Sequence, residues 1–375
     1  MSRISAEELR RTTLARQFPR IETRDADGVL ALFEHLGPIQ SQVPRAPFIT
    51  VSARLPGISY QTVRDLFVDH RLLKTTSIRG TVHTSVRADF VRLDAVCRKA
   101  RLPLLRRALK LGSVEPAAVV AEVECYTRDD WRSRDEIVAH LTRWLAERGS
   151  RFDANTFTGN LFWGHSGLIR RPKDTHWEKR TDIFHRTAAE VVRLPPLPDP
   201  TDALADLVRV HLRSYGPLGR ADLAFFFGVG LGQIDTALTA LADQVVQLIG
   251  PDSETLLDLA EPATDGDPEP GLRLLPEYDG LLVGYAGPNR TRFCSADQLA
   301  RVWAKVNGVF SPVVLADGRL VATWKTVADR TRTLLEVTML PGESVLGEDA
   351  FADQLAALGR VLALDIGMVR VLPSR

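Results

Sequence analysis

Apolar positions recur every three to four residues through most of the first two thirds of the chain, as in helices with one buried face. Residues 27–36 follow this pattern up to Gly37-Pro38. A glycine accepts the left-handed backbone at a helix end, and a proline cannot continue the helix. The sequence therefore predicts that the chain is extended from Ile39 onward.

The first 112 residues contain the pattern of several helices followed by two strands. Ser5 and Glu8 form a capping box that opens a helix to about Gln17. Further helices are expected at 48–55, 60–70 and, rich in Arg and Lys, 87–110, with strands at 72–78 and 81–85 that meet at Arg79-Gly80. Three helices and a β-hairpin are the order of a winged helix.

The same order recurs twice, without detectable sequence identity between the copies. Helices at 115–126, 133–148 and 155–165 precede expected strands at 168–171 and 176–184. The proline-rich residues 195–200 form a stiff linker. Beyond it, helices at 202–215, 220–227 and 231–242 precede a strand at 245–249.

The last third changes from helical to mixed periodicity. Strands are expected at 272–275, 281–285, 313–315, 320–322 and 334–339, and helices at 296–305 and 351–362. Asp317-Gly318 is a strong signal for a hairpin turn. We expect a small mixed α+β, barrel-like unit that packs on the helical units.

Composition narrows the class of protein. The 375 residues exceed one ordinary domain, and no signal segment or membrane-length apolar run is present, so a cytoplasmic location is expected. The scattered Cys97, Cys125 and Cys294 argue against a disulfide framework or a cysteine-rich metal site, and no metal or cofactor is expected. Residues 1–200 hold 33 Lys and Arg against 24 Asp and Glu, which is compatible with nucleic-acid binding but also with a solvated basic face.

Gln40-Ser41-Gln42 stands directly after the helix stop. In an extended segment both glutamines point to the same side, about 6.6 Å apart, while Ser41 faces the other side. Pro44 and Pro47 stiffen the exit from this segment. The alternative is a polar loop whose amides satisfy nearby backbone groups.

An ordered set of motifs accompanies the glutamines: Arg79-Gly80-Thr81-Val82-His83, Leu274 to Asp279, Asn307-Gly308-Val309 and Asp317-Gly318-Arg319. From about Ile4 to Leu372, this set resembles the winged-helix DNA glycosylases of the AlkZ/YcaQ type. The resemblance implies three tandem winged-helix units in a C-shaped arrangement plus a C-terminal α+β unit, divided as 1–112, 113–198, 199–262 and 263–375. With Gln42 in the third place, the chain resembles the Gln-x-Gln branch, whose best-known member confers resistance to the DNA-crosslinking natural product azinomycin B.

The resemblance implies a monofunctional DNA glycosylase in which Gln40 and Gln42 are catalytic. A neutral glutamine is a poor base, so the substrate must already carry a good leaving group. A guanine alkylated at N7 is cationic and leaves as a neutral base, and the enzyme then has to position water and stabilise developing charge. The expected substrate is a bulky or crosslinked N7-alkylguanine in an open basic channel. The motif has no nearby lysine that could form a Schiff base, so a strand-cleaving lyase mechanism is not expected.

The expected partner is double-stranded DNA with an alkylated guanine, bound by a monomer. Candidate DNA contacts are Arg45, Lys74, Arg79, His83, Arg106, Lys110, Arg319 and Lys325. His83 could instead be a structural residue. A tryptophan is usually a core residue, but Trp324 could instead reach a DNA groove beside the Asp317-Gly318 hairpin. Two other functions stay open: a non-catalytic winged-helix regulator and, with little support, a hydrolase in the C-terminal unit.

Overall fold

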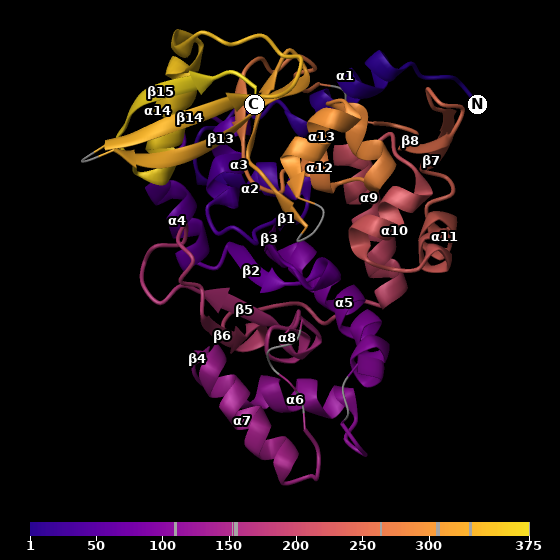
Figure 1. Cartoon of the computed structure of the whole chain (residues 1–375). Coiled ribbons are helices and arrows are strands. Elements are labelled where there is room, and N and C mark those ends of the chain that lie inside the picture. Colours follow the sequence, from indigo (N-terminus) through magenta and orange to yellow (C-terminus); the bar gives the residue numbers. More distant parts are fainter. Residues whose placement is uncertain are drawn as a thin grey trace.

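The computed structural model describes the whole chain except residues 109–110, 152, 154–156, 263–264, 305–307, 330–331 and 375. Figure 1 shows a broad upper body, which contains both termini, and a narrower lower lobe formed by α6, α7, α8 and strands β4 to β6. The fold is mixed α+β.

The first unit follows the predicted order closely. Its helices and strands are α1 (Ala6–Gln17), α2 (Ala26–Leu36), β1 (Ile39–Gln40), α3 (Ala46–Arg54), α4 (Tyr60–Val68), β2 (Leu72–Thr76), β3 (Val82–Val86) and α5 (Arg87–Ala108). The capping box of Ser5 and Glu8 forms as expected. Gly37 ends α2 at a φ of 75°, which confirms the predicted helix stop.

The second unit supplies the lower lobe and extends the sheet of the first. It contains α6 (Pro116–Tyr126), β4 (Arg132–Ser133), α7 (Arg134–Ala146), α8 (Phe157–Trp163), β5 (Leu168–Arg171) and β6 (Phe184–Thr187). β2 pairs with β5 through Thr75 and Ile169, which gives one six-stranded sheet in the order β1-β3-β2-β5-β6-β4. The strand that carries Gln40 therefore lies at an edge of this sheet.

The third group of helices is buried against the first. It contains α9 (Pro200–Tyr215), α10 (Arg220–Phe227), α11 (Leu231–Ala240), β7 (Val245–Ile249) and β8 (Thr255–Leu259). Leu14 of α1 and Leu93 of α5 share a hydrophobic core with Val208 of α9. The Arg16 guanidinium forms a two-bond ion pair with the Asp258 carboxylate, at 2.6 and 2.9 Å, and both side chains are buried.

The C-terminal unit covers α3. Its elements are β9 (Arg273–Leu275), α12 (Gly280–Val283), α13 (Ala296–Val302), β10 (Trp303–Ala304), β11 (Val309–Phe310), β12 (Val313–Ala316), β13 (Arg319–Asp329), β14 (Arg332–Met339), α14 (Ala352–Leu362) and β15 (Ile366–Leu372). The main sheet has the order β15-β14-β13-β12-β9, so it is open rather than barrel-like. Phe48 and Val51 of α3 share a core with Val314 and Leu335.

Two expected strands differ from the structure. Residues 281–285 were predicted as a strand, but Asp279 accepts a hydrogen bond from the Leu281 N–H and begins the short helix α12. Periodicity cannot distinguish a short buried helix from a buried strand. In the second wing, the strand is Phe184–Thr187 and not 176–184. The four domain boundaries remain a prediction, and two of the cores run across them.

Candidate active site

Residues 39–45, which we call the glutamine turn, comprise β1 and its connection to α3. The strand ends at Gln40 and is shorter than the extended segment that the sequence predicted. Ser41 continues the pairing, because its N–H donates to the Val82 carbonyl at 2.7 Å and its hydroxyl lies 2.7 Å from that of Thr84. Gln40 is 8% exposed, whereas Gln42 is exposed to solvent.

The hydrogen bonds of the two glutamines orient their amide groups. Gln40 Oε1 accepts from Nη2 of Arg79 at 3.3 Å, and Gln42 Oε1 accepts from the Val82 N–H at 3.1 Å. A guanidinium and a backbone N–H can only donate, so these atoms must be the amide oxygens. Among the described residues, neither amide nitrogen makes a hydrogen bond. Gln42 thus satisfies one backbone group, as the alternative proposed, yet each glutamine keeps an NH₂ donor and an oxygen lone pair.

Arg79 occupies a constrained place between the first wing and α10. Its φ of 53° is left-handed, which is uncommon for a residue with a side chain. Its guanidinium donates to the Phe226 carbonyl and lies 5.1 and 5.5 Å from the ring centroids of Phe225 and Phe226. Burial, with a smaller effect from Arg290, lowers the pKa of Arg79 to about 10. Arg79 is therefore partly enclosed and donates within the protein.

His83 and Lys74 are buried, which corrects their predicted role as DNA contacts. His83 pairs with Gln40 across the sheet, is 0% exposed, and has its Nδ1 3.1 Å from the Thr81 carbonyl. Burial and the nearby Arg79 lower the pKa of His83 to about 3, so the ring is neutral at physiological pH. Lys74 is 1% exposed with its Nζ 3.9 Å from Asp182, and burial lowers its pKa to about 8. Both were predicted to contact DNA because they lie on the first wing near the basic helix, but both side chains are buried.

The downstream side of the glutamine turn is held by the segment between β9 and α12. Arg45 donates to the Glu277 carboxylate at 2.5 Å and to the Thr326 hydroxyl at 3.1 Å. At the other end of α3, Arg54 forms two hydrogen bonds of 3.0 Å with Asp279, and both side chains are 1% exposed. α3 is thus fixed at both ends by ion pairs to one short segment.

The remaining predicted DNA contacts lie at different places. Arg106 is exposed and paired with Glu115, and Lys325 is 63% exposed and lies 2.6 Å from Glu336. Arg319 is exposed, but the neighbouring Gly318 is buried with its Cβ position 3.2 Å from Leu14 of α1. The Asp317-Gly318 turn therefore packs on α1 and is not a free groove probe. Lys110 lies outside the described residues.

Trp324 is also part of the interior. It is 3% exposed and its indole N–H donates to the Leu275 carbonyl at 2.9 Å, which corrects the suggestion that it reaches a groove. Arg45 lies over its ring, 5.6 Å from the centroid. The Trp324 ring therefore packs against Arg45 at the downstream end of the glutamine turn.

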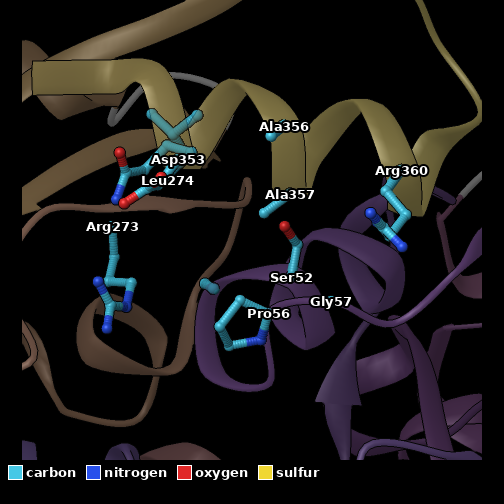
Figure 2. Close-up of a pocket in the computed structure, with 11 residues that line it drawn as sticks. Ser52, Pro56, Gly57, Arg273, Leu274, Asp353, Ala356, Ala357 and Arg360 are labelled. Atoms are coloured by element: carbon cyan, nitrogen blue, oxygen red, sulfur yellow. The ribbon is translucent and has the colours of Figure 1, made fainter. Parts of the chain in front are cut away.

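Cavities beside the turn differ in size, and one of about 330 Å³ is lined by Arg45, Glu277 and Lys325. The cavity that Gln40 lines, together with Thr50, Arg54 and Asp279, has a volume of about 10 Å³, enough for about one water and far too small for a purine. A cavity of about 420 Å³ lies between the end of α3 and α14, with Ser52 and Arg360 among its lining residues (Figure 2). Neither glutamine lines that larger cavity. Within the described residues, no cluster of His, Cys, Asp and Glu could hold a metal ion.

Comparisons with known proteins settle the family. A sequence model described as DNA glycosylase AlkZ-like matches residues 33–361. The chain belongs to the AlkZ-like DNA glycosylase family. The chain is 24% identical over 371 residues to the interstrand DNA cross-link repair glycosylase of Streptomyces sahachiroi, covering 96% of each sequence. Its fold is similar to the solved structure of the Streptomyces sahachiroi DNA glycosylase AlkZ, with a TM-score of 0.79, 21% identity, and coverage of 99% and 100% of the two chains. This AlkZ-like protein is therefore a DNA glycosylase.

The sequence did not reveal the groups that hold the glutamines. Arg79 was noticed, but for a phosphate contact, and its partners Phe225 and Phe226 were not singled out. The roles of Glu277 and Asp279 were also missed, although both lie in the 274–279 motif. The only available signal was the presence of two acidic residues inside an otherwise apolar stretch.

No single helix among the described residues is long and apolar enough to cross a membrane. In the same part of the chain, the pair of α10 and α11, bent by 112° at the break between them, has the length and apolar composition of a membrane span only when the two helices are taken together.

Proposed function

We propose that this AlkZ-like glycosylase hydrolyses the N-glycosidic bond of bulky or crosslinked N7-alkylguanine in double-stranded DNA, with Gln40 and Gln42 as its catalytic residues. The observation that carries the proposal is the pair of oriented, uncharged amides at the glutamine turn. Their oxygens already accept from Arg79 and from Val82. None of these groups is a base at neutral pH, so the chemistry must rely on a leaving group that needs no strong activation.

A cationic N7-alkylguanine meets this requirement, because breaking its bond to the sugar releases a neutral base. The sugar develops positive charge while water approaches its anomeric carbon. In this scheme the free lone pairs of the two amide oxygens accept hydrogen bonds from that water, which releases a proton to solvent once it has bonded to the anomeric carbon, and the amide nitrogens donate hydrogen bonds to sugar or phosphate oxygens. The protein gains rate by holding these groups in place before the reaction.

The surroundings of the turn support access for a large lesion. Gln42 is exposed, and the cavity beside Gln40 is too small to enclose a base. A crosslinked guanine cannot rotate freely into a pocket, since it stays tied to the opposite strand. The cross-link repair activity named for the Streptomyces sahachiroi relative is consistent with this substrate class.

The proposal extends to the biological setting. We infer self-resistance to a DNA-alkylating natural product, in the cytoplasm, by a monomer. We keep Arg45, Arg106, Arg319 and Lys325 as candidate phosphate contacts, because each is at least partly exposed. Three winged-helix units remain our proposal for how the DNA is gripped.

The test is a base-release assay. A duplex with one site-specific N7-alkylguanine is incubated with the protein, and the products are examined for free base and for an abasic site that breaks only after alkali. Release of both supports the proposal, and breakage without alkali contradicts a monofunctional enzyme. Binding without release would favour the non-catalytic regulator.

A further inference from the structure

Arg79 forms a direct link between Gln40 and α10, two segments that are far apart in the sequence. One guanidinium nitrogen donates to Gln40 Oε1 at 3.3 Å, and the other donates to the Phe226 carbonyl. Among the described residues, no carboxylate lies within 4 Å of this guanidinium, which distinguishes Arg79 from Arg45 and Arg54. Its charge is therefore not neutralised beside the amide that it contacts.

The aromatic side chains of α10 enclose the guanidinium. Its central carbon lies over the rings of Phe225 and Phe226, and Arg290 lies over Phe225 at 4.8 Å. A guanidinium over an aromatic face is attracted by the ring quadrupole. Gly228 completes the enclosure, because a Cβ there would lie 3.0 Å from Arg79 Cγ.

The position of α10 is itself fixed. Asp222 in its first turn is 0% exposed and accepts hydrogen bonds from the Ala286 N–H at 2.7 Å and from Asn289 Nδ2 at 2.8 Å. These contacts join α10 to the C-terminal unit. A side chain gripped by such a helix has few alternative positions.

On the basis of the proposed function, we propose that Arg79 is a positioning residue for catalysis. Held by Phe225 and Phe226, it fixes the orientation of the Gln40 amide and polarises its oxygen. It does not contact a DNA phosphate. Polarisation makes the amide NH₂ a stronger donor, and fixed orientation removes the alternative in which the oxygen and nitrogen of Gln40 exchange places.

The first experiment compares Arg79→Ala with Arg87→Ala, a matched control at the start of α5 whose guanidinium donates to the His70 carbonyl at 2.9 Å. Single-turnover release of N7-alkylguanine should fall about tenfold or more for Arg79→Ala. The dissociation constant for DNA should stay within about twofold and its salt dependence should not change. Arg87→Ala should match the parent protein in all three measurements. A weaker Arg79→Ala complex whose salt slope is shallower by about 0.9 would overturn the proposal in favour of a phosphate contact.

A double-mutant cycle tests whether Arg79 acts through Gln40. The Gln40→Ala, Arg79→Ala double variant should release base no more than about twofold slower than Gln40→Ala alone, because the amide that Arg79 orients is already absent. Fully additive losses would overturn the proposed link.

Two milder variants guard against a folding defect. Arg79→Lys should recover part of the rate, since an ammonium can still donate to Gln40, and millimolar guanidinium ion should partly restore Arg79→Ala. Phe225 is 37% exposed, so Phe225→Leu should fold and show a rate between those of the parent and Arg79→Ala. An Arg79→Lys or Phe225→Leu protein with the full parent rate would overturn the proposal that Phe225 and Phe226 hold Arg79 for catalysis.

The outcomes for the two proposals differ. A parent protein that releases no base overturns the proposed function, and with it the catalytic role of Arg79. A parent protein that releases base, with loss of activity in Gln40→Ala but not in Arg79→Ala, overturns the Arg79 proposal alone.

Discussion

Upstream of the glutamine turn, Gln40 is held by an arginine that has aromatic and carbonyl partners, whereas downstream Arg45 and Arg54 hold α3 through the carboxylates of Glu277 and Asp279. The downstream charges are neutralised in pairs, and one of these pairs is almost completely buried. The upstream charge stays uncompensated next to the Gln40 amide, which we propose is catalytic. The difference suggests a division of work, in which ion pairs fix the scaffold and the isolated cation acts on the reacting group.

The largest expected effect is on the downstream side. Asp279→Asn leaves the Arg54 guanidinium buried without a counter-charge, and breaking a buried pair in this way typically costs about 3–5 kcal/mol. Denaturant unfolding should show this loss of stability. Asp353→Asn, an exposed change on α14, should stay within about 0.5 kcal/mol of the parent. Equal stability of the Asp279 variant and the parent would remove the scaffold role from this ion pair.

The glutamines themselves come next. Gln40→Ala and Gln42→Ala should each slow base release at least about tenfold, which is about 1.4 kcal/mol, while DNA binding barely changes. Gln61→Ala, an exposed glutamine on α4, serves as the matched control and should leave the rate unchanged. The parent rate in either catalytic variant would show that the site is elsewhere.

Acidic pH should lower the free energy of unfolding through His83, which lies on the upstream side of the turn. The pKa of this histidine is about 3 in the folded chain, against an ordinary value of 6.5, so the unfolded chain binds the extra proton between these values. The contribution of neutral His83 to the free energy of unfolding is complete above pH 6.5 and is lost as the pH falls from 6.5 towards 3. In His83→Gln, the stability lost per pH unit below pH 6.5 should be smaller than in the parent by about 1.4 kcal/mol. Parallel pH profiles for the two proteins would mean that His83 is not held neutral.

The smallest expected effect is that of a single surface cation. Lys325 is exposed and already paired with Glu336. If it contacts a phosphate, Lys325→Ala should lower the slope of log affinity against log salt by at most about 0.9, with no change in the rate at saturation. Arg360→Ala on α14 is the control. An unchanged slope for Lys325→Ala would place the DNA-binding surface away from β13.

Much of this architecture could be predicted because the relevant signals are local. The capping box of Ser5 and Glu8, the stop at Gly37 and the helix at 220–227 depend on neighbouring residues, and the structure contains all three. The glutamines could be located by their position after that stop and by the family resemblance. Their surroundings could not be predicted in the same way.

The contacts of Arg79 show why. Its partners Phe225 and Phe226 lie about 150 residues away, and pairing between them depends on how α10 docks on the first wing. Lys74 and His83 looked accessible because the pattern of their own strands does not show how the rest of the chain buries them. Side-chain burial that results from tertiary docking leaves no periodic trace in the sequence.

The most direct test of the account is the release of base from a duplex with one bulky N7-alkylguanine, measured for the parent protein and for Gln42→Ala under single-turnover conditions. We predict free alkylguanine and an alkali-labile abasic site from the parent, and at least about tenfold slower release from the variant at equal DNA occupancy. Release at equal rates from both proteins, or binding of the lesion by the parent without any release, would contradict the account.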